Sequence, residues 1–141
     1  MQPEFKEYAK QVVSNAKAFA DEFIKLGYKV ISNGTQNHMF VLDIYSSTNK
    51  KMTGKDLETE LDKINITLNK NQIPNDELPP LKSSGVRIGT PAMTTKGFKE
   101  ADFIKLANLI HNFINEYISF GTDTNYGFYQ EEVKSLIEKV L

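Results

Sequence analysis

The sequence predicts one α+β domain of two layers, with helices packed on a small, mostly antiparallel sheet. Three observations support this prediction. Helical apolar periodicity fills both ends of the chain, and short β-like runs separated by turn residues occupy its middle. The length of 141 residues suffices for one hydrophobic core and is short for two. We therefore expect a single domain over 1–141, in which 1–27 form a long linking helix and 28–141 form the α+β body.

The first expected element is an amphipathic helix from Pro3 to Leu26. Apolar residues recur along it at helical spacing, and the apolar stripe is wide enough to require a packing partner. Proline suits the first turn of a helix, and Gly27 suits the residue just past the end.

A β-hairpin is expected next. Two β-like runs cover 28–32 and 39–44, and the segment 33–37 between them is rich in turn-forming asparagine and glycine. The second run is almost continuously apolar, so we expect it to be covered on both faces. The polar residues 46–51 are expected to form a loop.

The middle of the chain alternates short elements with one long loop. Thr53 to Asp56 has the spacing of a variant capping box, which predicts a short helix. A brief strand is expected at 66–69, and another strand at 85–88. The loop from Asn71 to Lys82 contains three of the five prolines, and loops of this length in a compact domain tend to be functional.

Two helices are expected at the end of the chain. Apolar residues return at helical spacing from Phe98 to Tyr117, a polar break covers 121–127, and a last amphipathic helix follows. The order of elements is thus helix, hairpin, helix, strand, loop, strand, helix, helix.

Composition excludes several classes of protein. A formal net charge of −1 and scattered basic residues indicate neither a nucleic-acid partner nor an anionic membrane partner. The absence of cysteine excludes disulfides and thiolate metal sites, and no metal-binding spacing of other residues is found. No long apolar segment and no secretory signal are recognisable, so we expect a cytoplasmic protein.

Arg87 is the residue most indicative of a site, because it is the only arginine among 17 basic residues. A guanidinium binds a carboxylate through two parallel hydrogen bonds, which a lysine cannot do. Arg87 also lies on a short apolar run between Gly85 and Gly89, which allow a ligand to approach. From the residues alone, an anion-binding role and a plain surface salt bridge both remain open.

Other candidate residues are less specific. The segment 69–76 is dense in carboxamides, which suit recognition of a heterocycle but are more typical of plain turns. His38 and His111 have no metal-ligand spacing, and we assign no role to either. No acid/base pair, catalytic triad or phosphate-binding glycine loop is present, so the chain has no catalytic set of its own.

Five segments, in this order along the chain, carry a resemblance to a known family: 27–38, 53–55, 65–71, 84–92 and 96–98. Together they resemble the C-terminal region of serine hydroxymethyltransferase, from Pro3 to about Tyr117. After Gly121 only the helical pattern is similar. The resemblance implies the small C-terminal domain of a fold-type I, pyridoxal-phosphate-dependent transferase, which interconverts serine and glycine and passes a one-carbon unit to tetrahydrofolate.

The resemblance also implies roles for particular residues. The arginine of the family's SG-[IV]-R motif, here Arg87, binds the carboxylate of the amino-acid substrate. The second asparagine of the NKN motif, here Asn71, contacts the folate. The family's folate-binding Ser-Pro-Phe triplet aligns with Pro79, Pro80 and Leu81, of which only the central proline matches.

The family's Schiff-base lysine lies in a T-T-T-H-K motif, which is absent from this chain. We therefore expect a C-terminal domain that is inactive by itself, binds no cofactor in isolation and contributes no catalytic residue. The parent enzyme is expected to be a dimer or tetramer, and the isolated chain to self-associate through the helix from Phe5 to Ile24. A free-standing, non-catalytic ligand-binding or interaction module is the alternative, and a structural domain without a ligand is the third interpretation.

Overall fold

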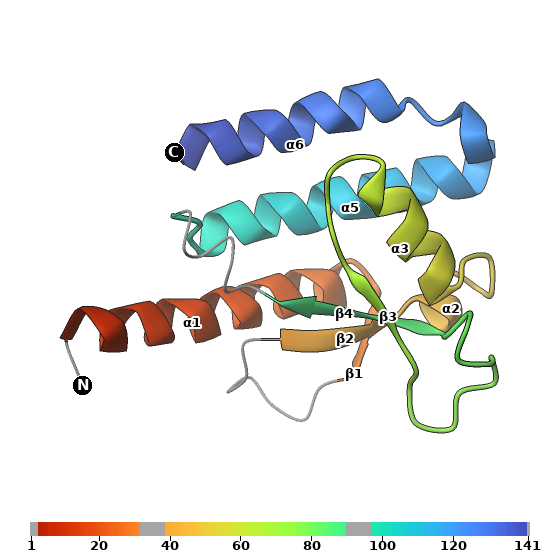
Figure 1. The fold of residues 1–141 in the computed structure, drawn as a ribbon, viewed down its shortest axis with the longest axis horizontal. Coiled ribbons are helices and arrows are strands. Elements are labelled where there is room, and N and C mark those ends of the chain that lie inside the picture. The colour runs from red at the N-terminus through yellow and green to blue at the C-terminus, as the bar shows by residue number, and fades with distance from the viewer. Residues whose placement is uncertain (1–2, 32–38, 90–96, 141) are drawn as a thin grey trace.

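The computed structural model describes residues 3–31, 39–89 and 97–140. Helices pack on one antiparallel sheet, which is the architecture that the α+β class predicts (Figure 1). The elements are α1 (Pro3–Lys25), β1 (Lys29–Ile31), β2 (Met39–Asp43), α2 (Ile44–Ser47), α3 (Gly54–Asp62), β3 (Asn69–Asn71), β4 (Gly85–Gly89), α5 (Glu100–Phe120), the 3₁₀ helix η1 (Gly121–Asp123) and α6 (Tyr126–Val140).

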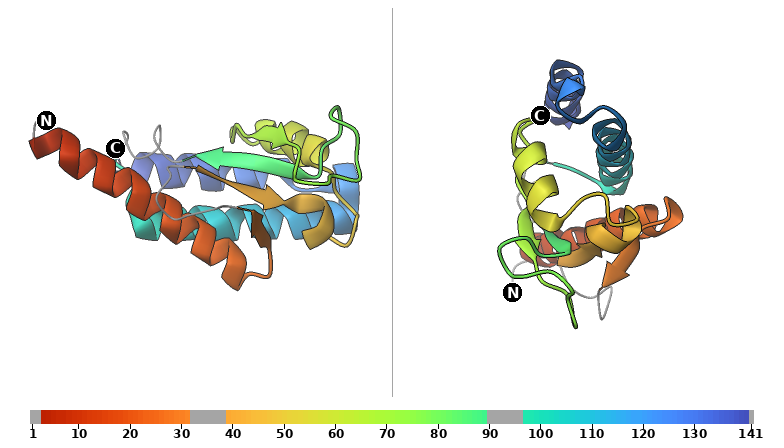
Figure 2. Two further views of the ribbon diagram at one scale, coloured as in Figure 1. Left: turned by 90° about the horizontal axis from the view of Figure 1, so that it is seen from below. Right: turned by 90° about the vertical axis from the view of Figure 1, so that its right-hand side faces the viewer.

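The four strands form one antiparallel sheet in the order β1-β2-β4-β3. The predicted hairpin is confirmed, because β1 pairs with β2 and sets Val30 opposite Leu42. Val86 of β4 also pairs with Leu42, so these three apolar residues lie on one face. Helices α5 and α6 lie on one side of the sheet, and the loop between β3 and β4 extends to the other side (Figure 2).

Helix α1 packs along α5 and over one end of the sheet (Figure 1). Its apolar stripe is covered within the chain, because Val12, Ala16, Phe19 and Phe23 are all buried. The predicted helix is therefore confirmed, although the middle of the surface that we expected to drive self-association is occupied by this chain's own α5. Ile24 remains 54% exposed at the end of the helix.

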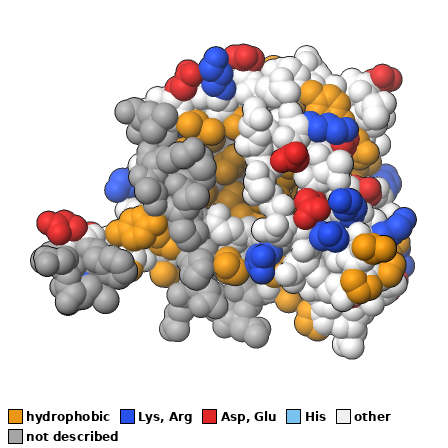
Figure 3. Space-filling model, in the orientation of Figure 1, with side chains coloured by type: hydrophobic (Ala, Val, Ile, Leu, Met, Phe, Trp, Pro, Cys, Tyr) orange, Lys and Arg blue, Asp and Glu red, His pale blue; other side chains and the backbone are white. Residues whose placement is uncertain are grey.

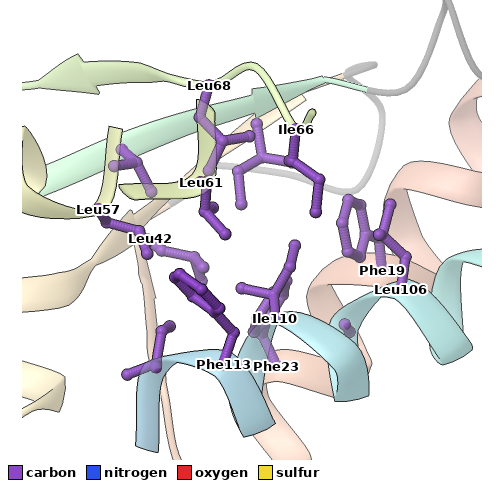
Figure 4. Packing of buried hydrophobic residues seen from close by; sticks show 14 of the residues in the cluster. Phe19, Phe23, Leu42, Leu57, Leu61, Ile66, Leu68, Leu106, Ile110 and Phe113 are labelled. Atoms are coloured by element: carbon purple, nitrogen blue, oxygen red, sulfur yellow. The ribbon is translucent and has the colours of Figure 1, made fainter. Parts of the chain in front are cut away.

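The core lies between the sheet and the helices. Aromatic rings from three elements meet there: the ring centroid of Phe19 is 5.1 Å from that of Phe103 on α5 and 5.6 Å from that of Phe40 on β2. Figure 4 shows the side chains of Leu57 and Leu61 of α3 pointing into the same core. Burial of this apolar cluster is the main force that holds the two layers together.

Helix α3 begins with the predicted capping box. Asp56 N donates to Thr53 Oγ1 and Thr53 N donates to Asp56 Oδ2, both at 3.0 Å. The first turn also contacts the chain just before β4, because Gly54 N donates to Ser83 O at 2.7 Å. This contact fixes the start of α3 against the start of the strand that carries Arg87.

A polar cluster joins α6 to α3. Glu60 is only 4% exposed, and its carboxylate accepts hydrogen bonds from Tyr126 Oη at 2.7 Å and from Lys63 Nζ at 2.6 Å. Burial and the hydrogen bond to Glu60 raise the pKa of Tyr126. Because a buried carboxylate is costly unless it is paired, this cluster holds the last helix in place.

Three predictions differ from the structure. The polar run after β2 is not all loop, because Asp43 Oδ1 accepts from Ser46 N and caps the short helix α2. The brief strand lies at 69–71 rather than 66–69, since Ile66 and Leu68 pack in the core before the strand begins. Strand β2 is buried on its helical face, whereas Met39 on its other face is 37% exposed. The predicted turn 33–37 lies outside the described residues.

Candidate functional site

Arg87 lies on the sheet face that is turned away from the helices. Burial alternates along β4, where Val86 and Ile88 are buried while Arg87 and Gly89 are exposed. In the described part of the chain, no salt bridge includes the guanidinium. The surface salt bridge considered from the sequence is thus absent among these residues, and the planar donor group can meet an external anion.

Strand pairing places two carboxamides on the same face as Arg87. Asn69 lies directly opposite Arg87, and Asn71 lies opposite Gly85, one pair further along. Residues two apart on a strand share a face, so Asn71 is diagonal to Arg87, with Cα atoms about 7–8 Å apart. Asn71 Nδ2 donates to Gln72 O at 2.8 Å, which leaves its carboxamide oxygen as an acceptor. We call Arg87, Asn69 and Asn71 the open-face cluster.

Pro79, Pro80 and Leu81 lie in the loop that joins β3 to β4. The turn is closed by Lys82 N and Ser83 N, which both donate to Pro79 O, at 3.0 and 2.9 Å. Leu81 is 81% exposed, and Figure 3 shows apolar side chains on the surface of this loop at the lower right. An apolar side chain this exposed is available to contact a ligand or another domain.

His111 belongs to the helix layer and not to the open-face cluster. Its Nδ1 is 2.9 Å from Tyr28 Oη, and its Nε2 is 3.2 Å from Asn115 Nδ2. Burial lowers the pKa of His111 and raises the pKa of Tyr28 to about 12, so both groups are neutral at neutral pH. The contact joins α5 to the start of β1 and supports the fold; His38 lies outside the described residues.

The His111 contact predicts a pH dependence of stability. A lowered folded-state pKa means that this contribution is complete above the pKa of an unfolded histidine, about 6.5, and is lost as the pH falls through the folded value. We expect the thermal midpoint of His111→Gln to fall less than that of the parent chain between about pH 7 and pH 5. Equal slopes in a thermal melt series would contradict this expectation.

The larger cavities lie away from the open-face cluster. One of about 620 Å³ lies between α5 and α6, one of about 400 Å³ lies between α6 and Asn65, and one of about 250 Å³ lies among α5, α6 and the residues before β3. Figure 3 shows a hollow with apolar side chains on its floor near the centre of the molecule. Arg87 lines none of these three cavities, so residue chemistry rather than cavity size identifies the site.

Two further findings concern classes of site. Within the described residues, no helix combines the length and apolar character that a membrane span requires. No grouping of three or more histidine or carboxylate side chains suited to a metal ion occurs in the same residues.

Sequence reasoning missed the position of Asn69 and the role of Asp76. Asn69 and Asn71 at period two would have indicated two carboxamides on one face of a strand. The pairing that sets Asn69 opposite Arg87 could not be read from the sequence. Asp76 lies in the loop after β3, where its carboxylate accepts hydrogen bonds from three residues of the same loop.

Comparisons with a family model and with curated relatives all indicate the same family. The family model described as serine hydroxymethyltransferase matches residues 1–110. A protein of that name from Mycoplasma mobile is 57% identical over 108 residues, which are 77% of this chain and 25% of the relative. Proteins of the same name from Phytoplasma australiense and Halorhodospira halophila are 56% and 52% identical over 76% and 78% of the chain, and 26% of each relative is covered. The chain thus spans about a quarter of the length of these curated relatives.

Proposed function

The chain belongs to the serine hydroxymethyltransferase family, and we propose that it acts as the C-terminal domain of such an enzyme. In that role it binds the carboxylate of serine or glycine through Arg87 and forms part of the tetrahydrofolate site. The observation that supports this most is the exposed guanidinium of Arg87, which shares an open sheet face with two carboxamides. The parent enzyme is a cytoplasmic homo-oligomer in this proposal.

Arg87 contributes orientation rather than bond-making. A guanidinium that donates two parallel hydrogen bonds fixes both the position and the plane of a carboxylate. The substrate's amino group and β-carbon are then directed toward the rest of the active site, which lowers the entropic part of the barrier. Strand β4 is hydrogen-bonded on both sides, by β2 and β3, so the guanidinium projects from a rigid support.

The folate contacts are assigned to Asn71 and to the loop residues Pro79, Pro80 and Leu81. The carboxamide oxygen of Asn71 suits a ring N–H of the pterin, because it is an acceptor on the face of Arg87. At the loop, an aliphatic Leu81 replaces the family's phenylalanine. We therefore propose that the loop contributes backbone groups and a general apolar contact rather than ring stacking.

The described residues of this chain do not fit pyridoxal phosphate itself. The cofactor requires a lysine amine for its aldehyde. In the described strands, the lysine on the face of Arg87 is Lys29, which lies on β1 and is separated from β4 by β2. Lys105, whose pKa is lowered by the adjacent Lys139, lies on α5 on the opposite side of the sheet. The cofactor is therefore assigned to the rest of the parent enzyme.

A chimera tests the proposed function. In it, this chain replaces the aligned region of the Mycoplasma mobile relative. We expect the chimera to convert serine to glycine with tetrahydrofolate and the isolated chain to be inactive, because covalent catalysis needs the missing lysine. The measurement is glycine formation by each purified protein. Activity of the isolated chain, or a folded, cofactor-binding chimera without activity, would contradict the proposal.

The alternative is a free-standing module that binds a ligand without catalysis. Calorimetric titration of the isolated chain with serine, glycine and tetrahydrofolate separates the two interpretations. A module must bind one of them measurably by itself, whereas a domain that forms only part of a shared site is expected to bind each weakly. Absence of heat from all three, with an active chimera, favours the domain.

A further inference from the structure

The loop between β3 and β4 is organised around one carboxylate. Asp76 Oδ1 accepts hydrogen bonds from Leu78 N at 2.8 Å and from Ser84 Oγ at 2.5 Å. Asp76 Oδ2 accepts from Ile73 N at 3.2 Å and from Ser84 N at 2.9 Å. Both oxygens are therefore used, and the donors come from the beginning, the middle and the end of the loop.

Ser84, which donates two of these hydrogen bonds to Asp76, is itself held in place by other contacts. Ser84 is buried, and its carbonyl oxygen accepts hydrogen bonds from Ile44 N and Tyr45 N, both at 2.9 Å. Ser84 also directly precedes β4, which carries Arg87 three residues later. Asp76 thus joins the loop to its own last residue, directly before β4, which is also held by the start of α2.

The part of the loop that Asp76 encloses carries the exposed turn. Residues 79–81 lie between two of its contacts, Leu78 and Ser84. Inside this interval, Ser83 Oγ donates to Pro80 O at 2.8 Å, and at its start Gln72 Nε2, from the beginning of the loop, donates to Leu78 O at 3.1 Å. The turn has no helix or strand of its own, so its position depends on these contacts and on the hydrogen bonds that Gly54 N and Lys55 N donate to the carbonyl oxygens of Ser83 and Lys82 just after it.

We infer that Asp76 is a positioning residue, whose ionised carboxylate holds the exposed turn at 79–81 in place relative to Arg87 for contact with the folate. This inference rests on the proposed function for the identity of the ligand. In this inference Asp76 contacts neither the amino-acid substrate nor the folate, and it acts through the turn at 79–81.

The protonation state of Asp76 agrees with this role. Partial burial would raise the pKa of the carboxyl, but hydrogen bonds from the Ser84 side chain and from the Leu78, Ser84 and Ile73 backbone lower it below its ordinary value. The carboxylate therefore remains ionised at neutral pH. Charge-assisted hydrogen bonds of this kind are roughly twice as strong as neutral ones.

Asparagine cannot replace Asp76 in this arrangement, although it has the same shape. Each carboxylate oxygen accepts from a backbone N–H, so an amide group at either position would set one N–H against another. The neighbouring Glu77 provides a matched control. It is exposed, and its carboxylate pairs with Lys50 across the surface at 3.4 Å, so Glu77→Gln removes the same charge at little cost.

The experiment compares Asp76→Asn and Glu77→Gln in the active chimera. We expect Asp76→Asn to raise the KM for tetrahydrofolate about tenfold, the equivalent of about one charge-assisted hydrogen bond, with the KM for serine within about twofold. Glu77→Gln is expected to match the parent in both. In the isolated chain, Asp76→Asn is expected to accelerate hydrogen exchange at Ile73, Leu78 and Ser84.

Ser84→Ala keeps the test decisive if Asp76→Asn does not fold. It removes the hydroxyl contact and leaves the three backbone contacts, so a smaller rise in the same KM is expected. An equal rise in the KM values for tetrahydrofolate and serine, together with a lower thermal midpoint, would show that Asp76 is purely structural and would overturn the inference. An unchanged KM for tetrahydrofolate would also overturn it. If Arg87→Lys is also without effect, the proposed function fails; if only the Asp76 variants are normal, this inference alone fails.

Discussion

Arg87→Lys in the chimera is expected to lower kcat/KM for serine by about 100-fold or more, while binding of the cofactor persists. A lysine keeps the positive charge but loses the planar pair of donors, so the carboxylate can rotate about a single contact. The guanidinium forms no salt bridge with the described residues, so the substitution leaves no ionic partner unpaired among them. The measurements are steady-state kinetics and the absorbance of the bound cofactor.

Lys29→Gln is the control for Arg87→Lys. Lys29 is an exposed cation on the same face of the sheet, but it lies on the edge strand β1 rather than on β4. A general electrostatic attraction of the anionic substrate would be weakened by Lys29→Gln, which removes a charge, but not by Arg87→Lys, which keeps it. A specific carboxylate contact is lost only in Arg87→Lys, and near-normal turnover by that variant would rule out the assignment.

Gly54→Ala is expected to destabilise the chain by about 3 kcal/mol. A Cβ at Gly54 would lie far inside van der Waals distance of the Gly85 carbonyl oxygen and 3.0 Å from the Ser83 carbonyl oxygen. Both obstacles are backbone atoms, so no side-chain rotation can relieve the overlap. The start of α3 must move away from β4, which would also break the hydrogen bond from Gly54 N to Ser83 O.

Gly127→Ala is the matched control in the same chain. A Cβ at Gly127 would have Asn125 Oδ1 at 3.7 Å as its nearest neighbour, an ordinary contact, and alanine is the better helix former by up to about 1 kcal/mol. Urea unfolding of the two variants should therefore give changes of opposite sign. A loss below about 1 kcal/mol for Gly54→Ala would mean that the contact between α3 and β4 is not rigid.

Elements with local signals were predictable from the sequence. The periodicity of α1, α5 and α6 and the capping box at Thr53 each depend on residues within one or two turns, and the structure confirms them. Helix α2 and the position of β3 were not predictable in this way. The first depends on a single cap by Asp43, and the second on pairing between residues 69–71 and a strand more than ten residues later.

The sequence suggests a chemistry for the candidate site but does not give its geometry. The lone arginine indicated a carboxylate contact, and the segment 69–76 stood out by its carboxamides. The sequence could not indicate that Asn69 faces Arg87, because strand register is set by contacts across the sheet. Nor could it distinguish Asp76 from its neighbour Glu77, since only the folded loop shows which carboxylate turns inward.

The contact between Glu60 and Tyr126 shows that the folded unit extends beyond the region that the family model matches. The family model ends at residue 110, inside α5, yet the buried Phe113, Ile114 and Val133 lie beyond it. A fragment cut at that limit would expose this apolar surface and leave a buried carboxylate without its phenol partner. When this domain is exchanged between relatives, α6 should therefore be transferred together with α3, even if the α6 sequences of the two relatives do not align.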